Sequence, residues 1–350
     1  MSDDNARNGI RGRRPSISPA LLTSLRQAYG FTQVLNVRDI GGSSNLNVYF
    51  EAEGEPCVAR VYRPSVSRQR LMAIQTTREV LLQHGVPCAP ARITSVNQKF
   101  AYHQDSLMEV ESFVPSTAKM DTPERITMAM PWLARIHGVL ATLPYDVHGD
   151  APLFSNHIES VDVLPALTRV QDRVRIWSPS REEIEISSMM QDLAERVVIA
   201  EGPYLAALKY QRTHGDFWDN NVFFTGNDIV LIADFDYMGR TARTDDLART
   251  LYFALSDFWS ESADTDTLIG YARSLVEMYN SAALPPLSTE ERRVLPFSIA
   301  RQPFWWVGNW FVDLDSMEVA RNGFHNVSRD LQLAREIMDH AAAWQTALTA

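Results

Sequence analysis

The hydrophobic pattern of this 350-residue chain changes character near residue 120. Before that point, short runs rich in β-branched and aromatic residues alternate with turn sequences, as in FTQVLNVRDI, LNVYFEAE and PCVARVYR. One longer run, VSRQRLMAIQTTREVLLQHG, has helical spacing and ends at Gly85. From Thr122 onward, helical spacing dominates. This order predicts a bilobal α+β fold, in which a small antiparallel β lobe with one long helix precedes a larger, mainly helical lobe.

The same pattern predicts where these parts begin and end. We expect residues 1–17 to be a disordered tail, 18–108 the β-rich lobe, 109–116 a hinge and 117–350 the helical lobe. Within the β-rich lobe, SPALLTSLRQAYG predicts a short helix, whereas ARITSV and FAYHQDSLMEVESFV predict further strands. Within the helical lobe, NNVFF and IVLIADFD are separated by the turn sequence TGND and predict a β-hairpin.

Charge and cysteine content limit the class of protein. The formal net charge is −10, from 33 basic and 43 acidic residues, which argues against nucleic acid as a partner and fits a cationic or metal-bridged substrate. Two cysteines, Cys57 and Cys88, are too few for a disulfide framework. No uncharged apolar run reaches the roughly 18 residues of a membrane helix, and the N-terminus lacks the apolar core of a signal peptide. We therefore expect a cytoplasmic monomer or homodimer with no membrane partner.

The tripeptide HGD occurs twice, and the residues after the two copies differ. In VHGDAPLFSN, no asparagine stands five residues after Asp150 and no apolar strand comes next. In THGDFWDNNVFF, Asn221 stands five residues after Asp216, and the predicted hairpin then leads to Asp234 in IADFD. The second copy therefore combines a loop carboxylate, an amide and a further carboxylate at a strand end.

Phosphoryl transfer from a nucleotide requires these groups. One carboxylate positions the acceptor hydroxyl and accepts its proton, while an amide oxygen and a second carboxylate hold the metal ions that bridge the phosphates. Asp216 fits the first role, and Asn221 and Asp234 fit the second. The sequence thus predicts ATP or GTP as phosphate donor and Mg²⁺ as cofactor.

With IADFD and TDDLA at these spacings, the chain resembles the aminoglycoside phosphotransferase and choline kinase superfamily, which are small-molecule kinases with a protein-kinase-like fold. The matching motifs span roughly residues 35–250. The loop is similar to that of the fructosamine kinase branch, which often has tryptophan where Trp218 stands. Asn220 departs from the glycine common in the family, although asparagine tolerates a left-handed backbone. The resemblance implies that the β-rich lobe binds the nucleotide.

The resemblance also assigns the nucleotide contacts. GGSSN would be the hairpin that covers the phosphates, although a plain turn explains it equally well. Arg60 takes the position of the family's phosphate-binding lysine, and Glu79 would be its ion-pair partner; the alternatives are a surface arginine and a solvated glutamate. The hairpin residues are Gly41, Gly42, Ser43, Ser44 and Asn45. The hinge residues near the base edge are Met108, Glu109, Glu111 and Phe113. The apolar residues around the base, which could equally be core, are Ile40, Val58, Phe223 and Ala233.

Further residues are expected around the catalytic loop. The resemblance makes Asp246 of TDDLA a brace for the loop, and His137 and His214 are predicted to be structural hydrogen-bonding groups. Acceptor contacts are expected from large-lobe side chains, of which the aromatic ones could equally be core. These acceptor candidates are Asp216, Trp218, Asp219, Asp236, Trp305, Trp306 and Trp310.

The acceptor is the least determined part of the prediction. Within the resemblance, the acidic excess favours a hydroxyl on an antibiotic or an amino-sugar-like compound, whereas a primary metabolite such as choline, homoserine, methylthioribose or a ketosamine is the alternative. A protein kinase would have arginine in HRD and an APE segment, whereas this chain has Gly215 in place of that arginine and no such segment. A nucleotide-binding pseudokinase is disfavoured because Asp216, Asn221 and Asp234 are all present.

Overall fold

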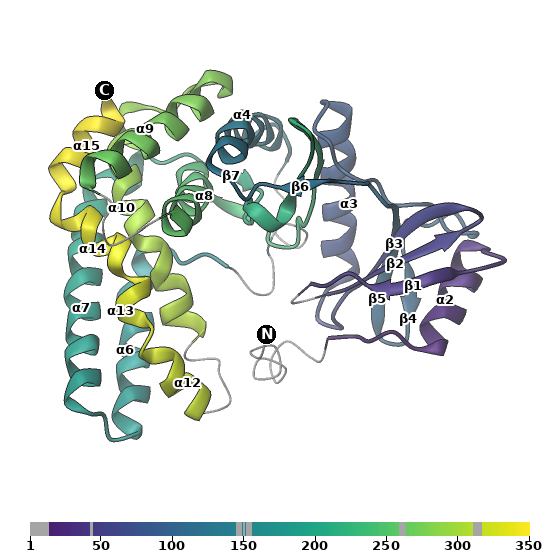
Figure 1. The fold of residues 1–350 in the computed structure, drawn as a ribbon, viewed down its shortest axis with the longest axis horizontal. Helices are drawn as coiled ribbons and strands as arrows, with labels where there is room; N and C mark the ends of the chain where they lie inside the picture. Colours follow the sequence, from purple (N-terminus) through teal and green to yellow (C-terminus); the bar gives the residue numbers. More distant parts are fainter. Residues whose placement is uncertain are drawn as a thin grey trace. The chain divides into compact units, whose positions relative to one another are not determined.

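The computed structural model describes residues 14–42, 45–144, 149, 151, 156–258, 264–310 and 317–350. The chain forms two compact units (Figure 1). Unit 1 consists of Met1–Ala118, Asp146–Leu153 and Phe223–Ala233, and unit 2 of Lys119–Tyr145, Phe154–Val222 and Asp234–Ala350. Unit 1 is built on a β-sheet and unit 2 is mainly helical, so the predicted α+β class is confirmed.

Unit 1 contains a five-stranded antiparallel sheet in the order β1-β2-β3-β5-β4. Its strands are β1 (Leu35–Asp39), β2 (Leu46–Ala52), β3 (Glu55–Val61), β4 (Ala101–His103) and β5 (Ser106–Ser112). In β2 buried and half-buried residues alternate, because successive side chains of a strand point to opposite faces. The buried face packs against Leu21 and Leu25 of helix α2.

The described part of unit 1 also contains helices α2 and α3, and α2 begins where its capping residue predicts. In α2 (Pro19–Tyr29), Ser18 Oγ accepts a hydrogen bond from Leu21 N–H at 3.1 Å, and Gly30 follows with φ +71°. Helix α3 (Arg68–Gln83) is the predicted long helix. The predicted strand ARITSV is wrong, because only Ala91 forms an isolated bridge. Residues 94–98 instead close a tight turn with Asn97 at φ +60°, which takes the chain away from the sheet.

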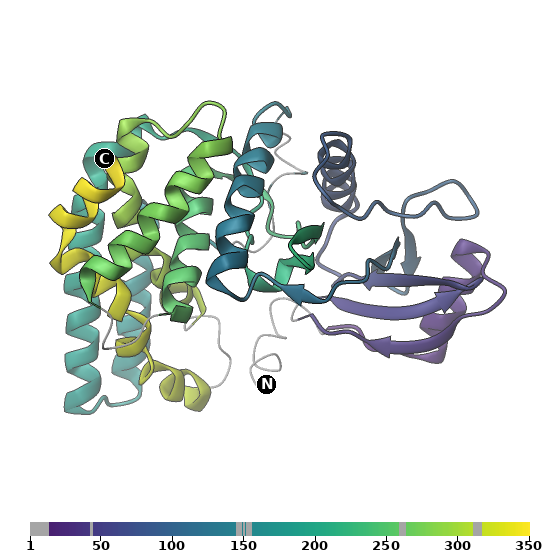
Figure 2. The same ribbon diagram turned by 45° about the horizontal axis from the view of Figure 1, so that its top comes forward.

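Unit 2 is a bundle in which α10 is buried over nearly its whole length (Figure 2). Ser288 and Glu291 form a capping box at its start, and Ser180 and Glu183 form another at α7. The longer helices are α4 (Pro123–Leu140), α6 (Ser160–Ile176), α7 (Arg181–Glu201), α8 (Arg243–Phe258), α9 (Thr265–Ala282) and α10 (Thr289–Trp305). The shorter ones are η1 (Gly202–Ala207), η3 (Trp306–Trp310), α12 (Met317–Phe324), α13 (Val327–Asp330), α14 (Gln332–Asp339) and α15 (Ala341–Thr349).

Short strands bracket the second HGD segment. β7 (Tyr210–Thr213) pairs antiparallel with β10 (Gly239–Ala242), so both ends of the intervening stretch are held together. Between them, the turn η2 (Asp219–Asn221) leads into β8 (Val222–Thr225) and β9 (Asp228–Ile232), which form the predicted hairpin and share a sheet with β6 (Ala118–Lys119). Because β7 and β10 are paired, the last residues of THGD and the last residues of IADFD lie near one another in unit 2.

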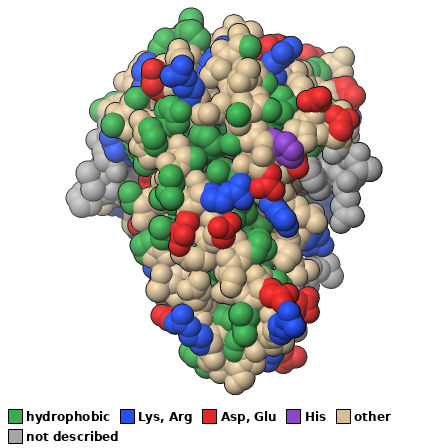
Figure 3. All heavy atoms as spheres, turned by 90° about the vertical axis from the view of Figure 1, so that its left-hand side faces the viewer, with side chains coloured by type: hydrophobic (Ala, Val, Ile, Leu, Met, Phe, Trp, Pro, Cys, Tyr) green, Lys and Arg blue, Asp and Glu red, His purple; other side chains and the backbone are tan. Residues whose placement is uncertain are grey.

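The molecular surface carries charges of both signs. On the face drawn in Figure 3, acidic and basic side chains are interspersed among hydrophobic ones. Mixed pairs also link helices, since Arg196 on α7 and Asp339 on α14 are 2.8 Å apart. The excess of negative charge is therefore not gathered on that face. Among the described helices, none has the length and apolar character needed to cross a membrane.

Candidate active site

The second HGD segment leaves β7 as a tight loop that helix α8 holds in place. Gly215 has φ +78°, and a Cβ atom there would lie 2.3 Å from the carbonyl oxygen of Tyr237, so the position requires glycine. Asp246, in the first turn of α8, accepts hydrogen bonds from the backbone N–H groups of His214 (2.9 Å) and Gly215 (3.0 Å). These contacts fix the backbone immediately before Asp216.

Two histidines complete this brace. His137 Nε2 lies 3.0 Å from Asp246 Oδ2, and its Nδ1 lies 2.7 Å from the Tyr279 hydroxyl. His214 Nδ1 accepts a hydrogen bond from the N–H of Asp216 at 3.2 Å. Burial acts to raise the pKa of Asp246, but the hydrogen bond and charge of His137 outweigh it, and the pKa lies below its ordinary value. Both histidines thus make structural hydrogen bonds, and Asp246 is held as an anion.

The Asp216 carboxylate is buried and receives a donor at each oxygen. Asn221 Nδ2 donates to Oδ2 at 2.8 Å, and Asn156 Nδ2 donates to Oδ1 at 2.8 Å. The guanidinium of Arg249 lies 3.6 Å from Oδ1. Burial, reinforced by the charge of Asp234, raises the pKa of Asp216 to about 7, although Arg249 and the Asn221 hydrogen bond act in the opposite direction. Such a group is suited to accept a proton near neutral pH.

The two predicted metal ligands lie beside this carboxylate. Asn221 Nδ2 also donates to the Asp216 carbonyl oxygen at 2.8 Å, so the amide nitrogen is directed at Asp216 and the amide oxygen faces elsewhere. Asp234 has φ +64°, a strained backbone for a non-glycine residue, at the end of the hairpin. Asn220 lies in the helical turn η2, where its side chain accepts a hydrogen bond from Lys119 Nζ at 2.6 Å; the left-handed backbone considered for Asn220 is not needed.

Two residues at this site were missed by the sequence analysis. Asn156 belongs to the segment after the first HGD copy, where no motif marks it. Arg249 donates to the carbonyl oxygen of Asn156 and so holds the amide that contacts Asp216. Its position in TDDLART could have indicated it, because residues three apart on a helix share a face and Asp246 already points at the loop.

Aromatic rings surround the Arg249 guanidinium. It lies 5.2 Å from the ring centre of Phe253 and 5.2 Å from that of Trp305, and the rings of Phe253 and Trp218 are 5.3 Å apart. The structure therefore brings two predicted acceptor residues, Trp218 and Trp305, into one aromatic group beside Asp216. This group is half-buried, as a surface for a bound molecule would be.

The other acceptor candidates are placed differently. Trp306 forms a hydrogen bond with Asp330, on α13. Asp219 and Asp236 are half-buried, the first in η2 and the second in the turn after the hairpin. The side chain of Trp310 lies outside the described residues.

In unit 1, the predicted pairing of Arg60 with Glu79 requires correction. Glu79 pairs with Lys99, whose Nζ lies 2.6 Å from its carboxylate. Arg60 on β3 is instead directly opposite Glu109 on β5, and its charge acts on that carboxylate. On α3, Gln75 and Arg78 supply the contacts to Glu109, whereas Glu79 is within reach of Lys99 and pairs with it instead. Glu109 is fully buried and accepts hydrogen bonds from Tyr62, Gln75 and Arg78.

Several residues of the predicted hinge region lie in strand β5. Met108, Glu109 and Glu111 lie inside β5, and their backbone pairs with β3. Glu111 also accepts a hydrogen bond from Arg78. Phe113 is the first residue beyond the strand, where its N–H donates to the Pro56 carbonyl at 3.0 Å. The segment LMEVESFV therefore continues strand β5 as far as Ser112, whereas the predicted hinge begins at residue 109.

The glycine-rich loop between β1 and β2 has the backbone that its sequence suggests. Gly41 and Gly42 have φ +99° and +112°, and a Cβ atom on Gly42 would lie 2.6 Å from Asn47 Nδ2. Arg14 steadies the loop by donating to the carbonyl oxygens of Gly41 and Asn45, each at 3.2 Å. Among the described residues, no atom lies within 4 Å of the position that a Cβ atom on Gly41 would take, so a ligand can approach the backbone there, whereas the same side of Gly42 is filled by Asn47.

The remaining nucleotide candidates are less informative. Ile40 is exposed, Asn45 is buried, and Val58, Phe223 and Ala233 are half-buried in unit 1. Ser43 and Ser44 lie outside the described residues. In the first HGD copy, the carbonyl oxygen of Gly149 accepts a hydrogen bond from Arg70 on α3 at 2.9 Å, and Asp150 lies outside the described residues.

The model of the phosphotransferase enzyme family matches residues 37–284, which include the loop, the hairpin and both carboxylates. The chain belongs to this family. It is a small-molecule kinase of the protein-kinase-like superfamily, as its motifs predicted.

Several solved structures share the fold of this chain. The amicoumacin kinase hAmiN, in complex with AMP-PNP, Ca²⁺ and Ami, has 13% identity and a TM-score of 0.68 over 93% of this chain and 94% of that one. A microcompartment-associated aminopropanol kinase has 16% identity and a TM-score of 0.69 over 91% and 97%. Choline kinase from Cryptosporidium parvum Iowa II has 14% identity and a TM-score of 0.56 over 89% and 93%. A comparison with curated protein sequences gives no match.

Proposed function

We propose that this kinase transfers the γ-phosphate of ATP or GTP to a hydroxyl group of a small molecule, with Mg²⁺ as cofactor. The observation that carries the proposal is the environment of Asp216, a buried carboxylate with a pKa of about 7 beside Asn221 and Asp234. The carboxylate accepts the hydroxyl proton as the acceptor oxygen bonds to the γ-phosphorus and the bond to the β-phosphate oxygen breaks.

Asn221 and Asp234 would hold the Mg²⁺. They offer oxygen ligands, which this hard cation prefers, and the amide nitrogen of Asn221 is already occupied by Asp216, so its oxygen is the end presented to a cation. When bound, the metal neutralises phosphate charge. The strained backbone of Asp234 fits such a role, because strain of this kind persists where function requires it.

Arg60 and the glycine loop would bind the phosphates of the nucleotide. Arg60 is held opposite the buried Glu109, which orients a positive charge on one face of the sheet. Gly41 allows phosphate oxygens to approach backbone N–H groups. The complex of hAmiN with AMP-PNP and Ca²⁺ supports a nucleoside triphosphate and a divalent metal.

For the acceptor, we favour an antibiotic-like compound with a planar or apolar body over a small primary metabolite. Trp218 and Phe253 are in ring contact, and Phe253 and Trp305 flank Arg249 beside Asp216, which offers aromatic faces to a planar or apolar body. Arg249 disfavours an amine placed immediately next to the reacting hydroxyl, since it puts a positive charge 3.6 Å from Asp216. An amino sugar remains compatible when its amine lies further from that hydroxyl.

A panel of acceptors tests the proposal. Antibiotics with and without aromatic groups, aminoglycosides, choline, homoserine, methylthioribose and ketosamines are incubated with ATP or GTP and Mg²⁺, nucleoside diphosphate release is coupled to absorbance, and the product is identified by phosphorus NMR. We expect a phosphate ester on one acceptor class, and loss of turnover by about two to four orders of magnitude in Asp216→Asn. Equal turnover in wild type and Asp216→Asn would overturn the assignment of the base.

A further inference from the structure

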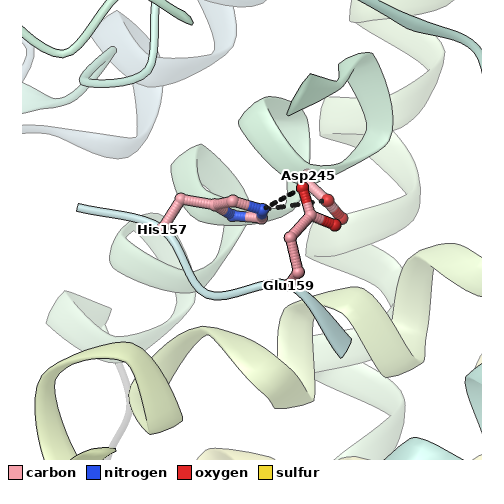
Figure 4. Close-up of side chains that lie close together, drawn as sticks. All are labelled: His157, Glu159 and Asp245. Carbon is pink, nitrogen blue, oxygen red and sulfur yellow. Dashed lines mark ion pairs between the residues drawn. The ribbon is translucent and has the colours of Figure 1, made fainter. Parts of the chain in front are cut away.

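A second convergence of ionisable side chains lies in unit 2, outside the chemistry proposed above. His157 and Glu159 precede α6, with Glu159 at its N-cap, and Asp245 lies in the first turn of α8 (Figure 4). His157 Nε2 lies 3.4 Å from Glu159 Oε1 and 3.4 Å from Asp245 Oδ2. One ligand atom from each residue therefore faces a common point, and all three lie within 4.8 Å of one another.

The separations fit a metal site, and without a metal His157 acts on Glu159 as a long hydrogen-bond and charge partner. An N–H···O hydrogen bond has a donor–acceptor distance of about 2.9 Å, shorter than either contact of His157. Around a tetrahedral metal with ligand bonds of about 2.0–2.1 Å, neighbouring ligand atoms are about 3.3–3.4 Å apart. Both distances from the imidazole nitrogen fall at this value.

Each carboxylate is already oriented through its other oxygen. The Tyr210 hydroxyl donates to Glu159 Oε2 at 3.2 Å, which turns Oε1 toward His157. Arg301 donates to Asp245 Oδ1, which turns Oδ2 toward His157. Metal-binding carboxylates are commonly held in this way by hydrogen bonds to the oxygen that does not bind the metal.

The side chains around this group also carry an excess of negative charge, which favours binding of a cation. Arg301 is buried and pairs with both Asp245 and Glu201, and the charge of Glu159 acts on it as well. Three carboxylates thus share one guanidinium, which leaves an excess of two negative charges when His157 is neutral. A divalent cation bound at Glu159 and Asp245 would balance that excess, and neutral imidazole is the form that binds a metal.

We propose that His157, Glu159 and Asp245 bind a divalent transition-metal ion, Zn²⁺ in preference, through one nitrogen and two carboxylate oxygens. The side chain of Glu159 is 35% exposed, so a fourth ligand can come from solvent. The ion ties the start of α6 to the start of α8. These are the segments that carry Asn156 and Asp246, which contact the Asp216 loop.

Binding is tested on the full-length protein, stripped with EDTA and free of nucleotide. Co²⁺ is added first, because its visible absorption reports four-coordinate geometry, and Zn²⁺ is then added to displace it. We expect one Co²⁺ per chain with four-coordinate absorption, its displacement by one Zn²⁺, and a higher melting temperature with Zn²⁺. His157→Ala and Glu159→Gln should each lower the affinity at least about tenfold. Glu159→Gln keeps an oxygen for Tyr210 and so preserves that hydrogen bond.

Two variants locate the site. His340→Ala removes an exposed histidine that lies 2.9 Å from Glu336, and should bind Co²⁺ as wild type does. Asp234→Asn removes a ligand of the proposed Mg²⁺ site and should also keep the four-coordinate Co²⁺. The proposal is overturned when wild type binds no stoichiometric four-coordinate Co²⁺. It is also overturned when His157→Ala and Glu159→Gln keep this Co²⁺, or when Asp234→Asn loses it. Phosphotransfer is not needed for any of these readouts, so an active kinase without this metal would refute the metal site alone.

Discussion

Replacing the proposed catalytic base with asparagine should stabilise the metal-free protein, and increasingly so as the pH rises. Asp216 has a pKa of about 7 in the folded protein against an ordinary value of 3.8, because burial disfavours its charge. The folded state therefore binds the proton more tightly than the unfolded state does. Stability from this group is greatest below pH 3.8 and is lost as the pH rises to about 7. The Asp216→Asn variant has no ionisable group at this position, so it does not lose stability in this way as the pH rises.

The size of the effect depends on the same two pKa values. At about 1.36 kcal/mol per pKa unit, ionisation of Asp216 costs the folded state about 4 kcal/mol at pH 8, of which about 2–3 kcal/mol is incurred between pH 5 and pH 8. The carboxamide of the Asp216→Asn variant has one oxygen, so it can accept from only one of the two amides that donate to Asp216, which costs about 1 kcal/mol at any pH. The variant should thus be about 3 kcal/mol more stable than wild type at pH 8, and nearly equal to it at pH 5.

Urea unfolding from pH 5 to pH 8.5, with EDTA and no nucleotide, measures this difference. Asp105→Asn, at an exposed aspartate of unit 1, is the matched control against which the change with pH is compared. The reasoning is refuted when the difference between Asp216→Asn and wild type is constant with pH, or when the variant is the less stable protein at pH 8. A catalytic group kept at a cost in stability is the expected trade-off at an active site.

Other changes give separate tests. Arg249→Met should raise the pKa of Asp216 further, because it removes a nearby positive charge, and should move the acidic limb of the kcat/KM profile to higher pH; an unmoved limb would contradict the charge effect. Gly215→Ala should lower turnover about a hundredfold, since the new Cβ would contact Tyr237 at 2.3 Å and displace the loop, and normal kinetics would exclude that requirement. Arg60→Ala should impair transfer strongly through nucleotide affinity or turnover, with Arg60→Lys intermediate in steady-state assays; a fully active Arg60→Ala would remove Arg60 from the site. Asp150→Asn should leave the kinetics unchanged, because no metal ligand follows it, and a severe loss in a folded variant would mean that the other HGD copy is catalytic.

Features set by residues close in sequence were predictable. The hairpin, the capped helices and the contact of Asp216 with Asn221 depend on spacings of a few positions. Contacts between segments far apart in the sequence were not predictable. Asn156 is 60 positions before Asp216, and nothing in its own segment indicates that it contacts a catalytic carboxylate. The partner of Glu79 likewise depended on which face of α3 meets the sheet, which the weak amphipathic pattern of RQRLMAIQTTREVLLQ does not define.

The choice of acceptor also depends on contacts that the sequence does not reveal. Net charge suggested a cationic substrate, yet the field at the reacting hydroxyl is set by the few groups nearest to it. Arg249 is 3.6 Å from Asp216 and is itself flanked by Phe253 and Trp305, in surroundings with little water to screen it. A charge at that distance outweighs distant surface carboxylates, whose effect falls off within about 10 Å in salt solution. Acceptor choice should therefore respond to Arg249→Met, and hardly to neutralisation of surface acids.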